Sequence, residues 1–331
     1  MNDRAVSLLE NYDISVTRTY KGRGCILCET DRGLKIFTEF RAPLQKLPLM
    51  DHLLKNVAEM NLVAVDTLVK TREGEYLVKD RDSVTYVLKD YYDAAECSVK
   101  SEEELKECMR TMALLHTGLF CPREAMPERI VRFDLESEVA RHNMLLRKIR
   151  KYVREKGTKT AFERYLLTEY DSYLAQADRV MERLSGEDFQ SFYEKVERER
   201  SFIHGDFQYH NVLFGASCRA VVNFERCRYD NRVGDISLFL RKIMEKFEWD
   251  YALGIRLLAE YERISPLDEK EKRQLFYRMA YPEKFRKVVS AYYNSNKAFQ
   301  SQVFGEKLQA ICNQEARKRI FMSKVFDDVI E

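Results

Sequence analysis

The chain has 331 residues, of which 45% are hydrophobic and 33% charged, a mixture typical of a folded globular protein and not of a disordered one. Its 56 basic and 54 acidic residues nearly cancel, and this balance argues against nucleic acid as a partner, because nucleic-acid binding requires a basic surplus. No apolar run approaches the ~20 residues of a membrane span, and the charged N-terminus does not have the form of a signal peptide. Eight scattered cysteines are typical of reduced thiols. We therefore expect a protein made in the cytoplasm, without a membrane partner.

The N-terminal part of the sequence, up to about residue 87, is rich in β-forming runs broken by glycine-containing turns. The expected elements are strands over 15–19, 24–30, 33–37, 62–69, 76–78 and 84–88, with one helix over 49–60.

From Ser101 the pattern changes to helix. Ser101-Glu102-Glu103-Glu104 has the form of a capping box ahead of an apolar series with helical spacing. Further elements are expected as amphipathic helices over 134–156, 161–184 and 189–199, a strand–turn–strand unit over 202–224, and helices from there to residue 331. The sequence thus predicts an α+β protein of two lobes: a small β-rich lobe over 1–90 and a large, mainly helical lobe over 91–331.

The segment from Phe202 to Asn211 carries the strongest chemical signal. It reads Phe-Ile-His-Gly-Asp-Phe-Gln-Tyr-His-Asn, with Asp206 and Asn211 five positions apart after a short apolar strand. Phosphoryl transfer requires a base for the acceptor hydroxyl, ligands for magnesium, a cation on the phosphates and a loop over them. Asp206 is the candidate base and Asn211 a candidate metal ligand, while His204 is expected to pack and to hydrogen-bond the loop.

A second apolar strand leads to Val222-Asn223-Phe224-Glu225, where phosphotransferases place a metal-binding aspartate. Asn223 supplies an amide in place of a carboxylate, which magnesium prefers. Glu225 is two residues further on, so strand alternation would place it on the same face, where it could compensate. Asp235 begins a helix and is interpreted as a structural N-cap.

In the first lobe, Lys35 lies in a strand just after a hairpin, which is where a phosphate-pairing lysine belongs. Gly22 and Gly24 flank Arg23 in a turn that could cover the phosphates. The acid that would orient Lys35 is not evident, since the following segment offers only Asp51 and, late in its helix, Glu59.

These residues, in this order, resemble the aminoglycoside phosphotransferase and choline kinase group of protein-kinase-like enzymes. More closely, the chain resembles the bacterial spore-coat CotS-type family. Beyond the two motifs, the likeness is carried by segments 86–91, 239–249, 281–285 and 292–297.

The resemblance implies a protein-kinase-like two-lobed fold that binds ATP and Mg²⁺ near a hinge that includes Leu88 and Asp90. The metal ligands would be Asn211, Asn223 and Glu225. It also implies assembly into the spore coat through contacts with coat proteins.

Two functions stay open at this point. One is an ATP-dependent phosphotransferase that acts on a hydroxyl of a small molecule or protein, and the other is a non-catalytic pseudokinase scaffold of the coat.

Overall fold

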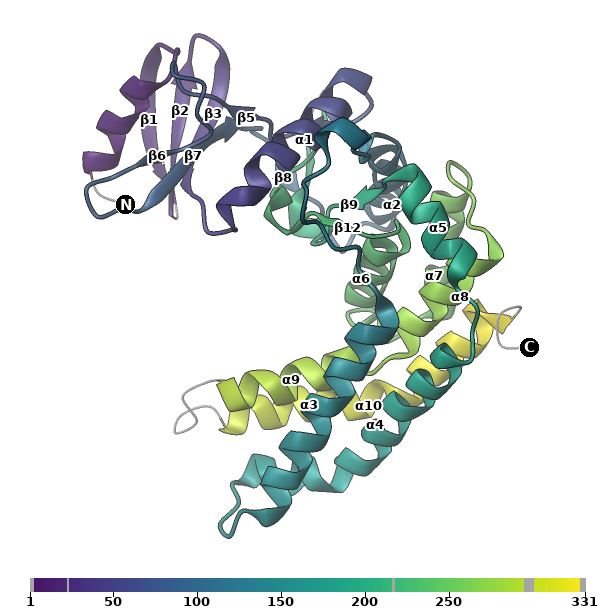
Figure 1. Cartoon of the computed structure of the whole chain (residues 1–331). Helices are drawn as coiled ribbons and strands as arrows, with labels where there is room; N and C mark the ends of the chain where they lie inside the picture. The colour runs from purple at the N-terminus through teal and green to yellow at the C-terminus, as the bar shows by residue number, and fades with distance from the viewer. Residues whose placement is uncertain (1–2, 23, 216–217, 295–300, 328–331) are drawn as a thin grey trace. The chain divides into compact units, whose positions relative to one another are not determined.

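The computed structural model describes residues 3–22, 24–215, 218–294 and 301–327 and divides into two compact units (Figure 1). Arg23 and Ser295–Lys297, which the sequence analysis used, lie outside the described residues. The first unit comprises Met1–Arg132, Val196–Leu238 and Glu260–Ser265, and the second comprises Phe133–Lys195, Phe239–Ala259 and Pro266–Glu331. This division follows the packing within the chain, and the lobe boundary at residue 90 stays a prediction.

The first unit begins with a short 3₁₀ helix, η1 (Asp3–Asn11), and an antiparallel sheet in the order β1-β2-β3-β7-β5, with β6 paired to β7 (Figure 1). The strands are β1 (Val16–Gly22), β2 (Cys25–Thr30), β3 (Gly33–Glu39), β5 (Leu68–Val69), β6 (Val78–Lys79) and β7 (Thr85–Asp90). One face of this sheet packs on η1 through a core that includes Tyr12, Phe37 and Leu88, all fully buried. Burial of such aromatic and aliphatic surface is the main stabilising term for this sheet.

Helix α1 (Leu47–Met60) follows η2 (Leu44–Lys46) and ends at Asn61, whose left-handed conformation (φ 52°) stops it. The chain then enters a second sheet in the order β4-β11-β10-β8, and β9 pairs separately with β12. These strands are β4 (Ala64–Val65), β8 (Ala95–Glu96), β9 (Phe202–Ile203), β10 (Val212–Phe214), β11 (Arg219–Val221) and β12 (Arg228–Tyr229). The parallel pairing of β4 with β11 brings Asp66 beside Asn223, far apart in the sequence.

Helix α2 (Glu102–Gly118) starts where the sequence predicts, but its cap differs from the prediction in one half. The Ser101 side chain accepts a hydrogen bond from Glu104 N at 3.2 Å. The Glu104 carboxylate accepts from Ser98 N at 2.7 Å and not from Ser101, so the reciprocal half of the predicted capping box is wrong. The backbone N–H group that binds the Glu104 carboxylate thus belongs to Ser98, three residues before the N-cap Ser101.

The second unit is helical. Its described helices are α3 (Leu135–Glu155), α4 (Ala161–Ser185), α8 (Glu269–Ala280), α9 (Glu283–Asn294) and α10 (Ser301–Val325), while α5 (Gln190–Glu199), α6 (Val233–Met244) and α7 (Tyr251–Glu262) contribute residues to both units. Helix α4 packs on α3, α8 and α10, and α10 also packs on α9 (Figure 1). Full capping boxes start α4 at Thr160 and α8 at Asp268, although the sequence analysis identified neither. Nowhere in the described ranges does a helix combine the length and the apolar character that crossing a bilayer requires.

Candidate active site

The loop after β9 carries the candidate base, and a glycine sets its shape. Gly205 has φ +75°, a conformation that L side chains rarely adopt. A Cβ atom at this position would lie 2.1 Å from the backbone oxygen of Arg226. The His-Gly-Asp sequence therefore requires glycine here both for its dihedral angle and for the close approach of the last residue of η5 (Phe224–Arg226).

Asp235, in the first turn of α6, fixes this loop through hydrogen bonds to its backbone. Its carboxylate accepts hydrogen bonds from the backbone N–H groups of His204 and Gly205, each at 2.8 Å, and lies 3.2 Å from Nε2 of His116. Burial alone would raise the pKa of Asp235, but His116, His204 and the Gly205 N–H outweigh it and hold that pKa below its usual value. The structural role predicted for Asp235 is confirmed. The predicted N-cap is wrong, because α6 begins at Val233 and Asp235 lies inside its first turn.

His204 packs inside the loop, as predicted, and its two ring nitrogens have different partners. Nδ1 accepts a hydrogen bond from Asp206 N at 3.1 Å, so Nε2 carries the hydrogen that it donates to Val222 O at 2.9 Å. The ring is fully buried against Phe224, with the ring centroids 4.4 Å apart. His204 thus joins the Asp206 loop to the strand end before Asn223.

Asp206 is partly accessible, with 20% of its side chain exposed. Its Oδ1 accepts a hydrogen bond from Gln208 Nε2, and its Oδ2 lies 3.8 Å from Nε of Arg226. Both contacts leave the carboxylate reachable by solvent.

The two candidate metal ligands Asn211 and Asn223 bind each other. The Asn223 side-chain amide donates to Oδ1 of Asn211 at 2.9 Å, and Asn211 donates to the backbone oxygen of Asp206 at 2.8 Å. Asn223 has φ +71°, a left-handed conformation that asparagine tolerates better than most residues. The oxygen that Asn211 would offer to a cation is therefore engaged by a neutral amide.

Glu225 does not extend the strand. β11 ends at Val221, and Phe224–Arg226 form a 3₁₀ turn, so the expectation that Glu225 and Asn223 share a strand face is wrong. The turn directs the Glu225 carboxylate to the ammonium group of Lys89, at 2.9 Å.

Lys89, on β7, is the centre of a buried ionic group that the sequence analysis missed. Its Nζ lies 2.7 Å from Asp66 and 2.9 Å from Glu225, and its side chain is 4% exposed. Asp66 also accepts from Asn223 N at 3.0 Å, so the triad Asp66–Lys89–Glu225 contacts the backbone of the metal-site motif.

Burial and the paired charges shift the pKa values of this triad in different directions. Burial opposes the charge of Lys89, but the two carboxylates outweigh it and raise the pKa of Lys89 above its ordinary value. Burial raises the pKa of Asp66, while the Lys89 ammonium overcomes burial and lowers that of Glu225. The triad is one cation held by two anions in the protein interior.

Lys35, the predicted phosphate lysine, lies on the other face of the sheet. In the β3–β7 register Lys35 is opposite Asp90 and Phe37 is opposite Leu88, so these four share the face of the η1 core. Lys35 donates to Asp90 at 2.8 Å and to the backbone oxygen of Arg32. The structure brings Lys35 and Asp90 together with each other and not with Asp206, and their roles stay predictions.

The remaining predicted contacts of the first lobe are local. Leu88 is fully buried in the η1 core, and in the sheet it lies between Phe37 of β3 and Val69 of β5. Gly22 pairs with Cys25 at the end of the β1–β2 hairpin, and Gly24 has φ +76°. Asp51, one of the acids considered for Lys35, instead binds Lys55 at 2.7 Å.

Comparison with known proteins places the chain in a family. Residues 5–325 match the family described as spore coat putative kinase YutH. The chain belongs to this family. Spore coat protein S of Bacillus subtilis (strain 168) is 21% identical over 317 residues, which cover 94% of this chain and 89% of that protein. The endospore coat-associated protein YutH of the same organism is 28% identical over 96 residues, which cover 29% of this chain and 28% of that protein.

Solved structures show the same fold. An aminoglycoside phosphotransferase from Alicyclobacillus acidocaldarius superposes with a TM-score of 0.82 at 18% identity, over 97% of this chain and 95% of that one. Spectinomycin phosphotransferase APH(9)-Ia, in complex with ADP and spectinomycin, superposes with a TM-score of 0.63 at 10% identity, over 95% of this chain and 98% of that one. A choline kinase from Cryptosporidium parvum gives 0.58 at 11%, over 99% of each chain. This member of the spore-coat family therefore has the protein-kinase-like fold of the aminoglycoside phosphotransferases and choline kinases.

The residues present do not fit the magnesium ion that this fold family uses with ATP. Magnesium takes oxygen ligands in octahedral geometry, usually one or two protein carboxylates together with waters and the phosphates of the substrate. Asn211 and Asn223 are neutral and hydrogen-bonded to each other, and Glu225 and Asp66 are ion-paired with Lys89. Within the described ranges, no group of three or more histidine, cysteine, aspartate or glutamate side chains is arranged to hold a metal ion.

Proposed function

We propose that this chain is a non-catalytic, kinase-fold component of the spore coat, made in the mother-cell cytoplasm and assembled by contacts with other coat proteins. In this proposal the former metal and phosphate site has become a set of internal contacts that stabilise the first unit. Membership of the spore-coat family supports the location, since the related spore coat protein S is named for the coat.

The observation that carries the proposal is that the groups at and around the predicted metal site are paired with one another. The Asn223 amide binds Asn211 at 2.9 Å, and the Lys89 ammonium binds Asp66 and Glu225 at 2.7 and 2.9 Å. To recruit Lys89 to a phosphate, the protein would have to leave Asp66, 2% exposed, as an unpaired buried charge. Such a change costs about 3–5 kcal/mol, which nucleotide binding would have to supply.

The second candidate function, an ATP-dependent phosphotransferase that acts on a hydroxyl group, is favoured by one observation. Asp206 remains partly exposed on a loop that Asp235 fixes, as a general base requires. This function would need metal ligation by Glu225 or by the two asparagines, and hence the opening of the contacts described above.

Calorimetric titration of ATP, with and without Mg²⁺, tests the proposal on the wild type, Asn223→Asp and Asp206→Ala. We expect no magnesium-dependent binding by the wild type. Asn223→Asp is expected to gain magnesium-dependent ATP binding, because the carboxylate supplies the missing negative charge. Asn223→Ser is the matched control, since it removes the amide without adding charge.

Spore-coat assembly gives an independent readout. A fluorescent fusion that carries Asp206→Ala should enter the coat as the wild type does, because assembly by contacts does not require the base. Magnesium-dependent binding and turnover of ATP by the wild type, lost in Asp206→Ala, would overturn the proposal in favour of the phosphotransferase.

A further inference from the structure

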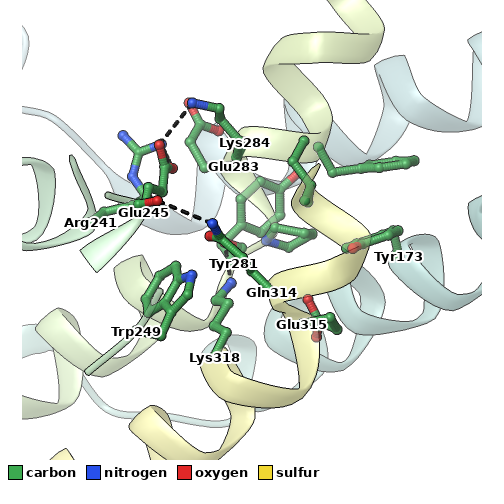
Figure 2. A pocket seen from close by; sticks show the side chains of 13 residues that line it. Tyr173, Arg241, Glu245, Trp249, Tyr281, Glu283, Lys284, Gln314, Glu315 and Lys318 are labelled. Carbon is green, nitrogen blue, oxygen red and sulfur yellow. Dashed lines mark hydrogen bonds and ion pairs between the residues drawn. The ribbon is translucent and has the colours of Figure 1, made fainter. Parts of the chain in front are cut away.

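Two segments that carry the sequence resemblance, 239–249 and 281–285, have no part in the kinase-like site, yet they meet inside the second unit. Together with α10 they surround a cavity of about 40 Å³ (Figure 2). Arg241 and Trp249 come from the first segment, Tyr281 from the second, and Gln314 and Lys318 from α10. The cavity is thus built from parts of the chain that are distant in sequence.

Arg241 brings to this cavity a buried cation whose ion pair with Glu245 is long. The residue is only 7% exposed. Its nearest acid is Glu245, one helical turn on, at 3.9 Å from Nη1. Among the described residues, the Arg241 guanidinium donates no hydrogen bond, although it has five N–H donors in a planar fork.

Lys318 brings a second cation. It is 9% exposed, and its ammonium donates only to the backbone oxygens of Ala280 and Tyr281, at 3.3 and 3.4 Å. In the described part of the chain no carboxylate lies within ion-pair distance of it, and the Trp249 ring centroid is 5.5 Å away. Burial, with the like charge of Arg241, lowers the pKa of Lys318 to about 8.

The acids that line the cavity already have cations of their own. Glu245 pairs with Lys284 at 2.8 Å, Glu283 with Arg286 at 2.5 Å, and Glu315 with Arg319 at 3.4 Å. Among the described residues, no carboxylate approaches Arg241 or Lys318 within hydrogen-bond distance, and an anion that contacts both cations would relieve their mutual repulsion.

We propose that this cavity is a binding site for a small carboxylate, which Arg241 holds through its planar fork and whose charge Lys318 neutralises. A guanidinium matches a carboxylate with two parallel hydrogen bonds, which a spherical anion cannot accept. The cavity volume of 40 Å³ leaves room for about three water-sized positions, and so for an anion the size of formate or acetate.

Trp249 provides the measurement, because it is the single tryptophan of the sequence and lies in the cavity wall. Sodium formate and sodium acetate would be exchanged for sodium chloride at constant ionic strength while tryptophan fluorescence is recorded. For the wild type we expect a saturable change with each carboxylate, in the millimolar range.

Lys318→Met should weaken formate binding at least 10-fold, since it removes the charge and keeps the length of the side chain. Lys324→Met, an exposed lysine on the same helix, is the matched control and should bind as the wild type does. Arg241→Lys keeps the charge without the fork and should lose carboxylate binding even if Lys318→Met fails to fold.

The proposal is overturned if the wild-type fluorescence does not saturate, or if Lys318→Met and Arg241→Lys respond as the wild type does. It is also overturned if chloride alone occupies the site, in which case exchange of chloride for formate produces no change.

Discussion

Replacement of Lys89 by methionine should destabilise the first unit severely, and by an amount that depends on pH. Lys89 is the shared partner of Asp66 and Glu225, at 2.7 and 2.9 Å, with exposed side-chain fractions of 3% for Asp66 and 29% for Glu225. Methionine fills the same space without charge, so the variant leaves the carboxylates of Asp66 and Glu225 without their cation. Glu225 can turn to solvent, whereas Asp66 keeps only the hydrogen bond from Asn223 N.

The expected loss at pH 7 is about 3–5 kcal/mol, the cost of leaving a buried charge without its partner. Since whole domains are stable by about 5–15 kcal/mol, this is a large fraction of the total. In the variant, Asp66 must protonate to remain buried, so its folded pKa rises far above the unfolded value of about 3.9. A raised carboxyl pKa means that stability is present at low pH and lost as pH rises, at up to about 1.4 kcal/mol per pH unit. The deficit should therefore be smaller at pH 5 than at pH 7.

Urea unfolding followed by far-ultraviolet circular dichroism at pH 5 and pH 7 measures both quantities. Lys35→Met is the matched control, because Lys35 is also a strand lysine paired with one aspartate, but its partner Asp90 is 30% exposed. We expect Lys35→Met to cost about 1 kcal/mol or less. The double variant Asp66→Asn/Lys89→Met should regain more than half of the loss. Equal costs for the two lysines, or a deficit that does not change with pH, would refute the reasoning.

Three further predictions concern other buried groups. Gly205→Ala should cost about 3 kcal/mol or more in urea unfolding, because the added methyl meets a backbone oxygen at 2.1 Å, whereas Gly74→Ala, at φ +85° in open space, should cost about 1 kcal/mol. Asp235 has a lowered pKa, so it adds stability above its unfolded pKa that is lost as pH falls through the folded value. Asp235→Asn should thus cost about 3 kcal/mol at pH 7 and less at pH 3, and an equal cost at both pH values would contradict the assignment. Glu163→Gln removes the carboxylate that Lys156 binds at 2.7 and 2.8 Å, and should lower the unfolding midpoint by the equivalent of about 2 kcal/mol.

The sequence located the catalytic-type loop because its signal is local. A short apolar strand, a glycine and an Asp-to-Asn step of five residues are adjacent in the chain, and the turn they form needs no partner to be recognised. Most elements of the two lobes were found for the same reason, since strand runs and helical spacing are properties of short windows. The single strand expected over 62–69 is wrong, because this run forms β4 and β5, which belong to two different sheets.

The choice of lysine could not be made in this way. Strand alternation separates Lys35 from its neighbours but does not say which face of the sheet meets the loop, and that depends on the β3–β7 register. Lys89 would have been found only by the observation that a lysine inside the buried run Val87-Leu88-Lys89 needs anions. Its partner Asp66 arrives through the parallel pairing of β4 with β11, which no local pattern reveals.

That same pairing has a consequence for synthesis on the ribosome. Asp66 and Asn223 are 157 positions apart, and the first unit also needs residues up to Leu238 and from Glu260 to Ser265. Strands β1, β2, β3, β5, β6 and β7 can pair among themselves as they emerge, but β4 waits for β11. Residues 133–195 of the second unit are made in between. Completion of the ionic triad is therefore a late event in folding, and a nascent chain that stops short of Glu225 holds Lys89 and Asp66 without their third partner.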